Sequence, residues 1–358
     1  MLTLLLEEPT TGVVSPSVVD GEVSYQLDRY PRWSLTARLR PDPVAVHLWQ
    51  SPYGTKASLF APDGALFYTG PIYMSSVSRP DGQWQIEAAD DTMFLRNWRT
   101  SGTPNQHVPG TTMDVPAFIR ALATLAGVDL DVRGQGGTVD VATLDIADSE
   151  GWALVEEQLI ANHLDVWPQG DGSLLVAPAA AIKGTPDHAL TVGVDGTITR
   201  YGITMSRVYN RVVITHEARK DGESDERYVE GVWEDTTSIA GTAIGPNVYT
   251  RNVRVGGDWW DDPAGHHVLA NMNAAAVAQQ VRGIARAATV DAVPDYTVRP
   301  GDTIDVTFLK GTRDRFLATG VTWPLAPGAM SIDLRNPDPE WPGSTFFVEE
   351  AGRARLHP

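Results

Sequence analysis

The chain has 358 residues, with 45 acidic and 28 basic side chains, a formal net charge of −17 and no cysteine. The length indicates two or three domains, since a domain takes roughly 100–200 residues. The lack of cysteine excludes a disulfide scaffold, a thiolate zinc site and a cysteine nucleophile. The acidic balance argues against tight wrapping of nucleic acid, because that requires Lys and Arg to neutralise phosphates.

The first residues are predicted to form a strand and not a targeting segment. Residues 1–8 lack the basic leader of a signal peptide, and their apolar stretch ends at Glu7. The chain contains no run of about 18 apolar residues, so no membrane-spanning helix is expected.

Residues 1–100 are predicted to form a first β-barrel domain. Apolar and polar residues alternate at 23–27 and again at 33–39, as they do on half-buried strands. A Pro-Asp-Gly turn sequence at 62–64 separates further short apolar stretches. Short strands at intervals of roughly 8–12 residues are typical of a small barrel or sandwich.

Residues 101–190 are predicted to form a small α/β module. Asp114 is placed to cap a helix that has Pro116 in its first turn, and a second helix is expected to begin near Ser149. A β-hairpin is expected within 164–176, where a Gly-rich turn separates two apolar stretches.

Residues 191–335 are predicted to form a second β-barrel domain with a long helix near 263–287, and residues 336–358 a C-terminal extension. Asp262 is placed to cap that Ala-rich helix, with Pro263 in its first turn. The expected fold class is therefore mainly β with an α+β insert, in which two small β-barrel domains flank a small α/β module.

Paired His and acidic residues are weak candidates for a metal or catalytic site. His266 and His267 are adjacent, and neighbours on a helix point about 100° apart, so they do not converge on one ion. Glycosidase carboxylates face each other roughly 5–10 Å apart across a sugar. Glu156 beside Glu157 on one helix does not provide that geometry, and Asp262 is better explained as a helix cap.

A glycine-rich loop and a tryptophan pair are the remaining candidates for a binding site. The loop at 134–137 lacks the Lys and Ser/Thr of a phosphate-binding loop, so a flexible connection is the favoured interpretation. Trp259 and Trp260 are candidate interface aromatics, with stacking on a sugar as the alternative. No catalytic residue, metal ligand or cofactor is predicted, and the protein is not expected to be an enzyme.

Three features in the last third of the chain carry a resemblance to a known family. They are a polar-then-apolar strand, a long Ala-rich helix, and a Pro-Gly-Asp turn that leads into another strand. The matched positions are Asn210, Arg211, Val212, Pro300, Gly301 and Asp302. In this order they resemble the baseplate hub or tail-tip hub proteins of tailed bacteriophages, which are minor tail proteins of long-tailed phages. Tyr296 departs from the pattern, since it stands near the position where that family has leucine.

The resemblance implies a structural tail-tip protein of the virion, assembled in the host cytoplasm. Such hubs are homotrimers whose six tail-tube-like barrels form a ring. The ring meets the distal tail or tail-tube protein on one side and a central spike or fibre on the other. The middle module would close or narrow a channel through which the tape-measure protein and DNA pass, without specific DNA binding. No cofactor and no membrane span are implied.

The acidity fits this hypothesis, because acidic groups along a channel would repel phosphate and let DNA slide. Alternatively, the charge only keeps the surface soluble. Two other functions stay open: a virion-associated carbohydrate-binding or peptidoglycan-degrading protein, and a β-rich adaptor of a cellular secretion or injection machine.

Overall fold

The structure of the chain is a computed structural model that describes most of its residues. They are residues 1–8, 12–27, 29–40, 55–77, 83–100, 108, 112–141, 144, 149–180, 183–193, 197–204, 209–219, 226–236, 239, 246–254, 263–281, 287–308, 311, 313–336, 346–350 and 353–357.

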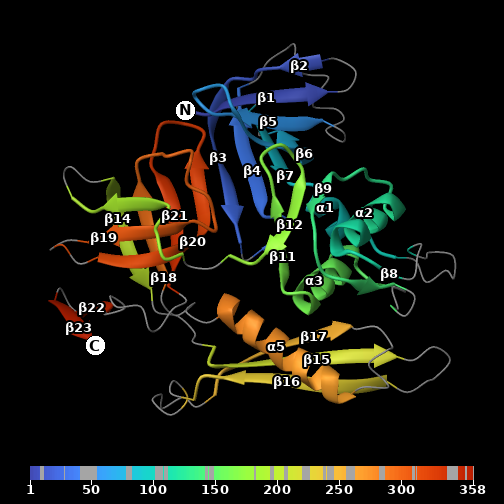
Figure 1. The fold of residues 1–358 in the computed structure, drawn as a ribbon. Coiled ribbons are helices and arrows are strands. Elements are labelled where there is room, and N and C mark those ends of the chain that lie inside the picture. The colour runs from blue at the N-terminus through green and yellow to red at the C-terminus, as the bar shows by residue number, and fades with distance from the viewer. Residues whose placement is uncertain are drawn as a thin grey trace.

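One large, mostly antiparallel sheet forms the centre of the molecule (Figure 1). Its strands are β1 (Thr3–Glu8), β2 (Gly12–Val14), β3 (Val18–Gln26), β4 (Trp33–Leu39), β5 (Lys56–Phe60), β6 (Leu66–Val77), β7 (Trp84–Ala89), β13 (His188–Thr191), β14 (Ile198–Thr204), β18 (Ala287–Ala292), β19 (Thr303–Thr307), β20 (Arg313–Pro324) and β21 (Met330–Arg335). They pair in the order β14-β18-β21-β20-β3-β4-β7-β6-β5-β1-β2, and β19 pairs with β20 and, in parallel, with β13.

The two β regions of the sequence share this sheet and a single hydrophobic core. β20 pairs with β3 with Trp323 opposite Val23, which joins the C-terminal region to the N-terminal one. In β4 the alternate side chains from Trp33 to Leu39 are buried, as the period of two requires. The sheet curls around this core as a half-barrel, and the prediction of a mainly β fold is confirmed.

The α/β module covers one side of the sheet (Figure 1). Its elements are α1 (Thr92–Asn97), β8 (Thr112–Met113), α2 (Val115–Leu125), β9 (Val132–Gly134), β10 (Val139–Asp140), α3 (Gly151–Ala161), β11 (Leu164–Pro168) and β12 (Leu174–Pro178). β12 lies between β11 and β9. Asp114 caps α2 as expected, because its carboxylate accepts from the Ala117 N–H at 2.7 Å. Phe118, Ile119 and Trp152 are buried in the core of this module.

A further unit lies within the range predicted as the second barrel. It consists of the three-stranded sheet of β15 (Arg211–Arg219), β16 (Glu226–Glu234) and β17 (Val248–Arg254), covered by α5 (Pro263–Val281). Val212, Ile214 and Val253 of the sheet pack against Ala274 and Val277 of the helix in a core of their own. The sequence range 191–335 thus contributes to two separate cores.

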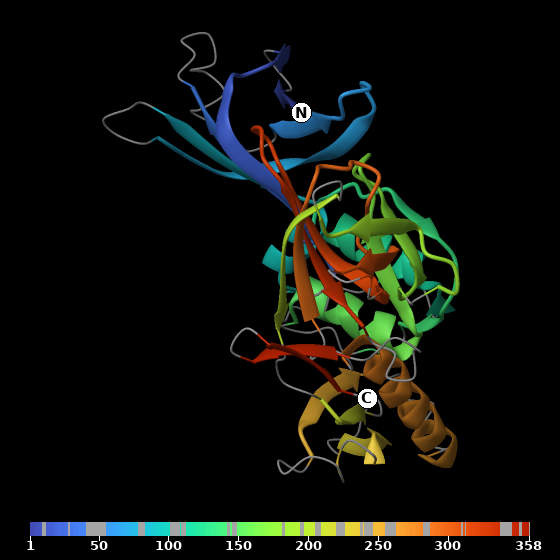
Figure 2. The ribbon, with the colours of Figure 1, turned by 90° about the vertical axis from the view of Figure 1, so that its left-hand side faces the viewer.

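The molecule is elongated, with the N-terminal strands at one end and the α5 unit at the other (Figure 2). The α/β module and the C-terminal strands of the large sheet lie between these ends. The C-terminal extension contains a hairpin of β22 (Phe346–Glu350) and β23 (Arg353–His357). Within the described residues, none of the helices has the length and apolarity needed to span a membrane.

Candidate functional site: the junction at the Pro-Gly-Asp turn

The Pro-Gly-Asp turn is closed by hydrogen bonds at both of its ends. The Asp302 N–H donates to the Arg299 carbonyl at 3.1 Å, and the Asp302 carboxylate accepts from the Arg299 N–H at 2.6 Å. Pro300 pre-sets the backbone of its position, and Gly301 has a φ of 95°, a conformation that favours glycine. The Gly301 N–H and the Asp302 carbonyl bond to Ala318 of β20 at 2.8 and 2.9 Å, which fixes the turn where β19 begins.

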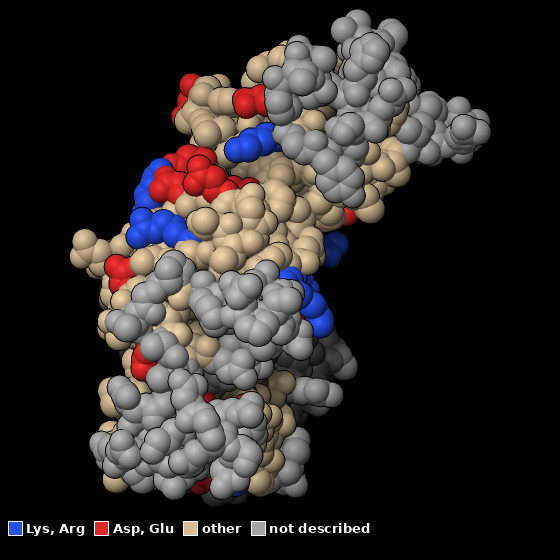
Figure 3. Space-filling model, turned by 90° about the vertical axis from the view of Figure 1, so that its right-hand side faces the viewer, with Lys and Arg blue, Asp and Glu red and all other residues tan. Residues whose placement is uncertain are grey.

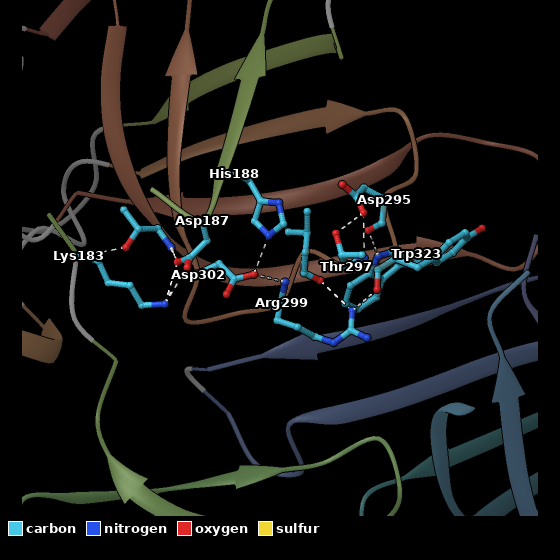
Figure 4. Close-up of polar contacts among 11 residues, drawn as sticks. Lys183, Asp187, His188, Asp295, Thr297, Arg299, Asp302 and Trp323 are labelled. Atoms are coloured by element: carbon cyan, nitrogen blue, oxygen red, sulfur yellow. Dashed lines mark hydrogen bonds and ion pairs between the residues drawn. The ribbon is translucent and has the colours of Figure 1, made fainter. Parts of the chain in front are cut away.

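Asp302 extends the turn into a polar cluster with the start of β13 (Figure 4). Its carboxylate lies 3.1 Å from His188 Nε2, and burial raises the pKa of Asp302. The neighbouring Asp187 carboxylate accepts from the Thr303 N–H at 2.9 Å and pairs with Lys183 at 2.9 Å. Burial acts to raise the pKa of Asp187, but the Thr303 N–H and the Lys183 ammonium outweigh it and lower that pKa. The cluster therefore ties β13 to β19 through side-chain hydrogen bonds as well as strand pairing.

Arg299 joins the turn to the aromatic core. Its guanidinium lies 4.5 Å from the centroid of the Phe67 ring and 5.5 Å from that of Trp323, within the range of cation–π attraction. It also donates to the Tyr296 carbonyl at 2.6 Å, while the Trp323 indole N–H donates to the Asp295 carbonyl at 3.0 Å. Phe67 belongs to the N-terminal half of the sheet, so Arg299 connects the two halves.

The turn also contacts the α/β module. A Cβ placed on Gly301 would lie 3.0 Å from the ring of Trp167 on β11, so glycine is the residue that leaves room for this ring. The Arg32 guanidinium lies 5.3 Å from the Trp167 ring centroid and donates to Asp165 at 2.7 Å. Three parts of the chain meet here, and these contacts hold them together as a structural junction.

Asn210 lies just before β15, and Arg211 and Val212 lie in it, so this motif belongs to the separate three-stranded sheet and not to the junction. The Asn210 side-chain oxygen accepts from the Asn247 N–H at 2.7 Å, and Arg211 lies 3.1 Å from Glu234 of the neighbouring strand β16. Val212 is fully buried against α5. The motif therefore fixes the start of β15, between the strands that pair with it on either side.

The other sequence candidates either lie outside the described residues or form structural contacts. Trp259 and Trp260 lie outside the described residues, as does the predicted cap Asp262. Glu156 accepts from the Trp152 indole N–H at 3.1 Å and forms an ion pair with Arg251. In the part of the chain that the structure describes, no group of three His, Asp or Glu side chains is arranged to hold a metal ion.

The glycine-rich loop has a structural explanation. A Cβ on Gly134 would lie 2.2 Å from the Val176 carbonyl oxygen of β12, and a Cβ on Gly137 would lie 2.7 Å from the Asn162 side chain. Both glycines have positive φ. Gly134 lets β9 approach β12 closely, and Gly137 leaves room for the Asn162 side chain at the end of α3, so no phosphate cradle is needed to account for them.

No sequence pattern predicted the contacts that bind the module to the sheet. Arg32 is buried and donates to Asp165, and the Trp33 indole N–H donates to the Pro168 carbonyl at 3.0 Å. The only local signal was a charged residue beside a tryptophan, and no residue pattern indicates the partner more than a hundred positions away.

The architecture is thus a mainly β fold that consists of a curled sheet, an α/β module and a sheet-and-helix unit. This is the fold of phage tail proteins. The chain superposes on a tail protein from Neisseria meningitidis MC58 with a TM-score of 0.62 and 16% identity, covering 94% of this chain and 96% of that one. The 43 kDa tail protein of prophage MuSo2 from Shewanella oneidensis gives 0.60 and 11%, covering 94% and 98%.

Prophage tail protein gp18 from Listeria monocytogenes EGD-e gives a TM-score of 0.55 and 10% identity, covering 93% of this chain and 94% of that one. No protein-family model matches the chain, and no curated protein matches it by sequence. The resemblance noted in the sequence is therefore confirmed at the level of the fold.

Proposed function

We propose that the protein is a structural component of a phage tail, and specifically a homotrimeric hub at the tail tip. The observation that carries the proposal is the length of the shared fold. Three phage tail proteins match nearly the whole of this chain with nearly the whole of their own, at TM-scores of 0.55 to 0.62. A match of that extent covers far more of the chain than one common sheet.

The geometry supports a structural role, in which the parts of the subunit are held in a fixed arrangement, and not a catalytic one. The junction at the Pro-Gly-Asp turn links the two halves of the large sheet to the module through Arg299, Phe67 and Trp167. A rigid subunit of this kind suits a ring in which each chain supplies two β regions. The division into a first β unit (1–100), a module (101–190), a second β unit (191–335) and an extension (336–358) is part of this proposal.

In the proposed assembly three copies adapt the sixfold tail tube, or a distal tail protein, to a threefold spike or fibre. The tape-measure protein and DNA pass through the channel of the ring. Trp259 and Trp260 are proposed interface aromatics. The protein acts in the virion, at the tail tip, after assembly in the host cytoplasm.

The channel is proposed to be lined by acidic groups, which would let DNA pass without binding. On the face shown in Figure 3, the described acidic and basic side chains lie close to one another instead of forming a field of one sign. We therefore expect the channel lining on another face. Electron microscopy of the purified protein tests the proposal, which predicts ring-shaped particles with threefold symmetry. Particles without rotational symmetry would contradict it.

The alternative is a virion-associated protein that binds carbohydrate or degrades peptidoglycan. Release of soluble fragments from purified peptidoglycan, abolished by Glu156→Gln or Asp262→Asn, would replace the structural proposal. We expect no release above the level of a heat-denatured control.

A further inference from the structure

A cavity of about 360 Å³ lies where four parts of the chain meet. Its walls include Leu27 after β3, Leu159 of α3, Tyr249 of β17 and Leu317 of β20. Small-molecule sites typically have volumes of about 300–1,000 Å³, so the space is large enough for a ligand or for a side chain of another molecule. Neither the tail-protein fold nor the proposed hub role assigns it a ligand.

Positive charge is concentrated around this cavity. Four guanidinium groups and two carboxylates line it, an excess of two positive charges in a chain with a net charge of −17. These residues are Arg29, Arg32, Arg251, Arg335, Glu156 and Asp165. Cationic groups gathered in a hollow with low-dielectric walls attract anions more strongly than the same groups spread over a surface.

The two carboxylates are already engaged by two of the arginines. Arg32 donates to both Asp165 oxygens, at 2.7 and 2.8 Å, and its side chain is only 3% exposed. Arg251 forms the ion pair with Glu156 across the gap between β17 and α3. These two ion pairs occupy both carboxylates of the lining and leave none for Arg29.

Arg29 and Arg32 both retain donor capacity at the cavity. The Arg29 guanidinium donates to two neutral acceptors, the Ser24 hydroxyl at 3.0 Å and the Ser34 hydroxyl at 3.3 Å, and no carboxylate among the described residues pairs with it. The buried Arg32 Nε has no acceptor among the described atoms. Guanidinium groups bind carboxylates through paired, charge-assisted hydrogen bonds, so an anion is the ligand these donors fit.

The remaining walls of the cavity indicate the kind of molecule to which the anionic group belongs. Leu159, Ile160, Leu164 and Leu317 line the same space, and such a surface favours an aliphatic body over a fully hydrated inorganic ion. We propose that the cavity binds a carboxylate on a short aliphatic body. This is the chemistry of a short dicarboxylate and equally of a glutamate side chain from another protein chain.

Isothermal titration calorimetry on the full-length protein tests this at low ionic strength. The probes are glutarate, a blocked tripeptide with a central glutamate, the same tripeptide with a central glutamine, and inorganic phosphate. Arg29→Gln is the informative variant because Arg29 is exposed and takes part in neither of the two ion pairs. Arg200→Gln is the matched control, since Arg200 is an exposed arginine on β14, away from the cavity lining.

We expect glutarate or the glutamate peptide to bind, and Arg29→Gln to weaken that binding at least about tenfold, because one charged hydrogen-bond donor is lost. Binding of glutarate alone identifies a free dicarboxylate as the source, and tighter binding of the peptide identifies a partner's side chain. The proposal is overturned if neither carboxylate binds, if phosphate or the glutamine peptide binds as tightly, or if Arg200→Gln weakens binding as much as Arg29→Gln. Its failure would not affect the hub proposal, which rests on the fold.

Discussion

Trp33 and Trp323 stack with their ring centroids 5.8 Å apart and their planes 22° from parallel. Trp33 lies on β4, in the N-terminal half of the large sheet, and Trp323 lies on β20, in the C-terminal half. Both side chains are almost fully buried, and Phe67 packs edge-on against each of them. The halves of the sheet therefore share one hydrophobic core, although the module and the α5 unit lie between them in the sequence.

Replacing Trp323 with alanine tests whether the two halves of the sheet depend on this shared core for stability. We expect Trp323→Ala to lower the free energy of unfolding by about 3–5 kcal/mol, because it removes a large buried side chain and leaves a cavity. Arg299 would also lose one of its two aromatic faces. Chemical denaturation monitored by circular dichroism measures the change. Val293→Ala, at a position 58% exposed, should shift stability by less than about 0.5 kcal/mol, and an equal effect of both changes would refute the shared core.

The ion pair of Arg32 with Asp165 should hold the module against the sheet. Asp165→Asn removes the charge that compensates the buried guanidinium, and breaking a buried pair from one side costs about 3–5 kcal/mol. The free energy of unfolding measures this, and limited proteolysis between the module and the sheet provides a second readout. Arg38→Gln breaks the exposed pair with Asp20 and should change little. A small effect of Asp165→Asn would show that the module is held by its apolar contacts instead.

The close approach of α5 to β16 depends on Gly231. A Cβ at this position would lie 2.0 Å from the Ala270 carbonyl carbon, and the Asn271 side chain accepts from the Val232 N–H at 2.8 Å beside it. Gly231→Ala should therefore push the helix away and cost on the order of 1–3 kcal/mol. Hydrogen exchange of the α5 amides reports the displacement. Gly202→Ala, at a strand glycine with open space around its Cβ, should leave that exchange unchanged; faster exchange in both variants would contradict the steric explanation.

The α5 unit should also become less stable in acid. His216 is fully buried, its Nε2 lies 2.9 Å from Asn273 Nδ2, and burial together with nearby His266 lowers the pKa of His216 from 6.5 to about 4. Protonation of the His216 ring would place its Nε2–H donor against the Nδ2–H donor of Asn273. Because the folded pKa is depressed, the unfolded chain binds the proton first, so this contribution is complete above about pH 6.5 and is lost as the pH falls toward about 4.

Between pH 7 and pH 5 the wild type should lose about 2 kcal/mol from this residue. His216→Gln keeps an acceptor for Asn273 and does not titrate, so its stability should fall less over the same interval. His267→Gln, at an exposed position, should follow the wild type. Parallel pH profiles of the wild type and His216→Gln would show that His216 is not the group responsible.

Local patterns predicted the helices and hairpins well. Asp114 and Pro116 mark the start of α2 because capping and a first-turn proline depend on neighbouring residues. The hairpin of β11 and β12 follows from its Gly-rich turn in the same way. The pairing of β20 with β3 and the parallel pairing of β15 with β17 join segments far apart in the sequence, and no local periodicity specifies such partners.

For the same reason, the turn at the candidate site could be predicted from the sequence but its contact partners could not. Pro300, Gly301 and Asp302 indicated a turn, and the structure has that turn. The turn's partners Trp167 and Phe67 come from other units of the fold. Gly301 packs against the Trp167 ring and the Arg299 guanidinium lies over the Phe67 ring, and these tertiary contacts leave no local pattern in the sequence. Asn210 to Val212 and the Pro-Gly-Asp turn both carried the resemblance to the hub family, yet they belong to different sheets. Motifs that follow one another in the sequence need not meet in space.

The molar mass of the protein in solution tests the proposed trimeric hub most directly. Size-exclusion chromatography with light scattering should be run on the full-length protein alone and mixed with a tail-tube partner. We expect a species of three copies in at least one of these conditions. A monomer at every concentration, with no trimer even beside the tube partner, would contradict it.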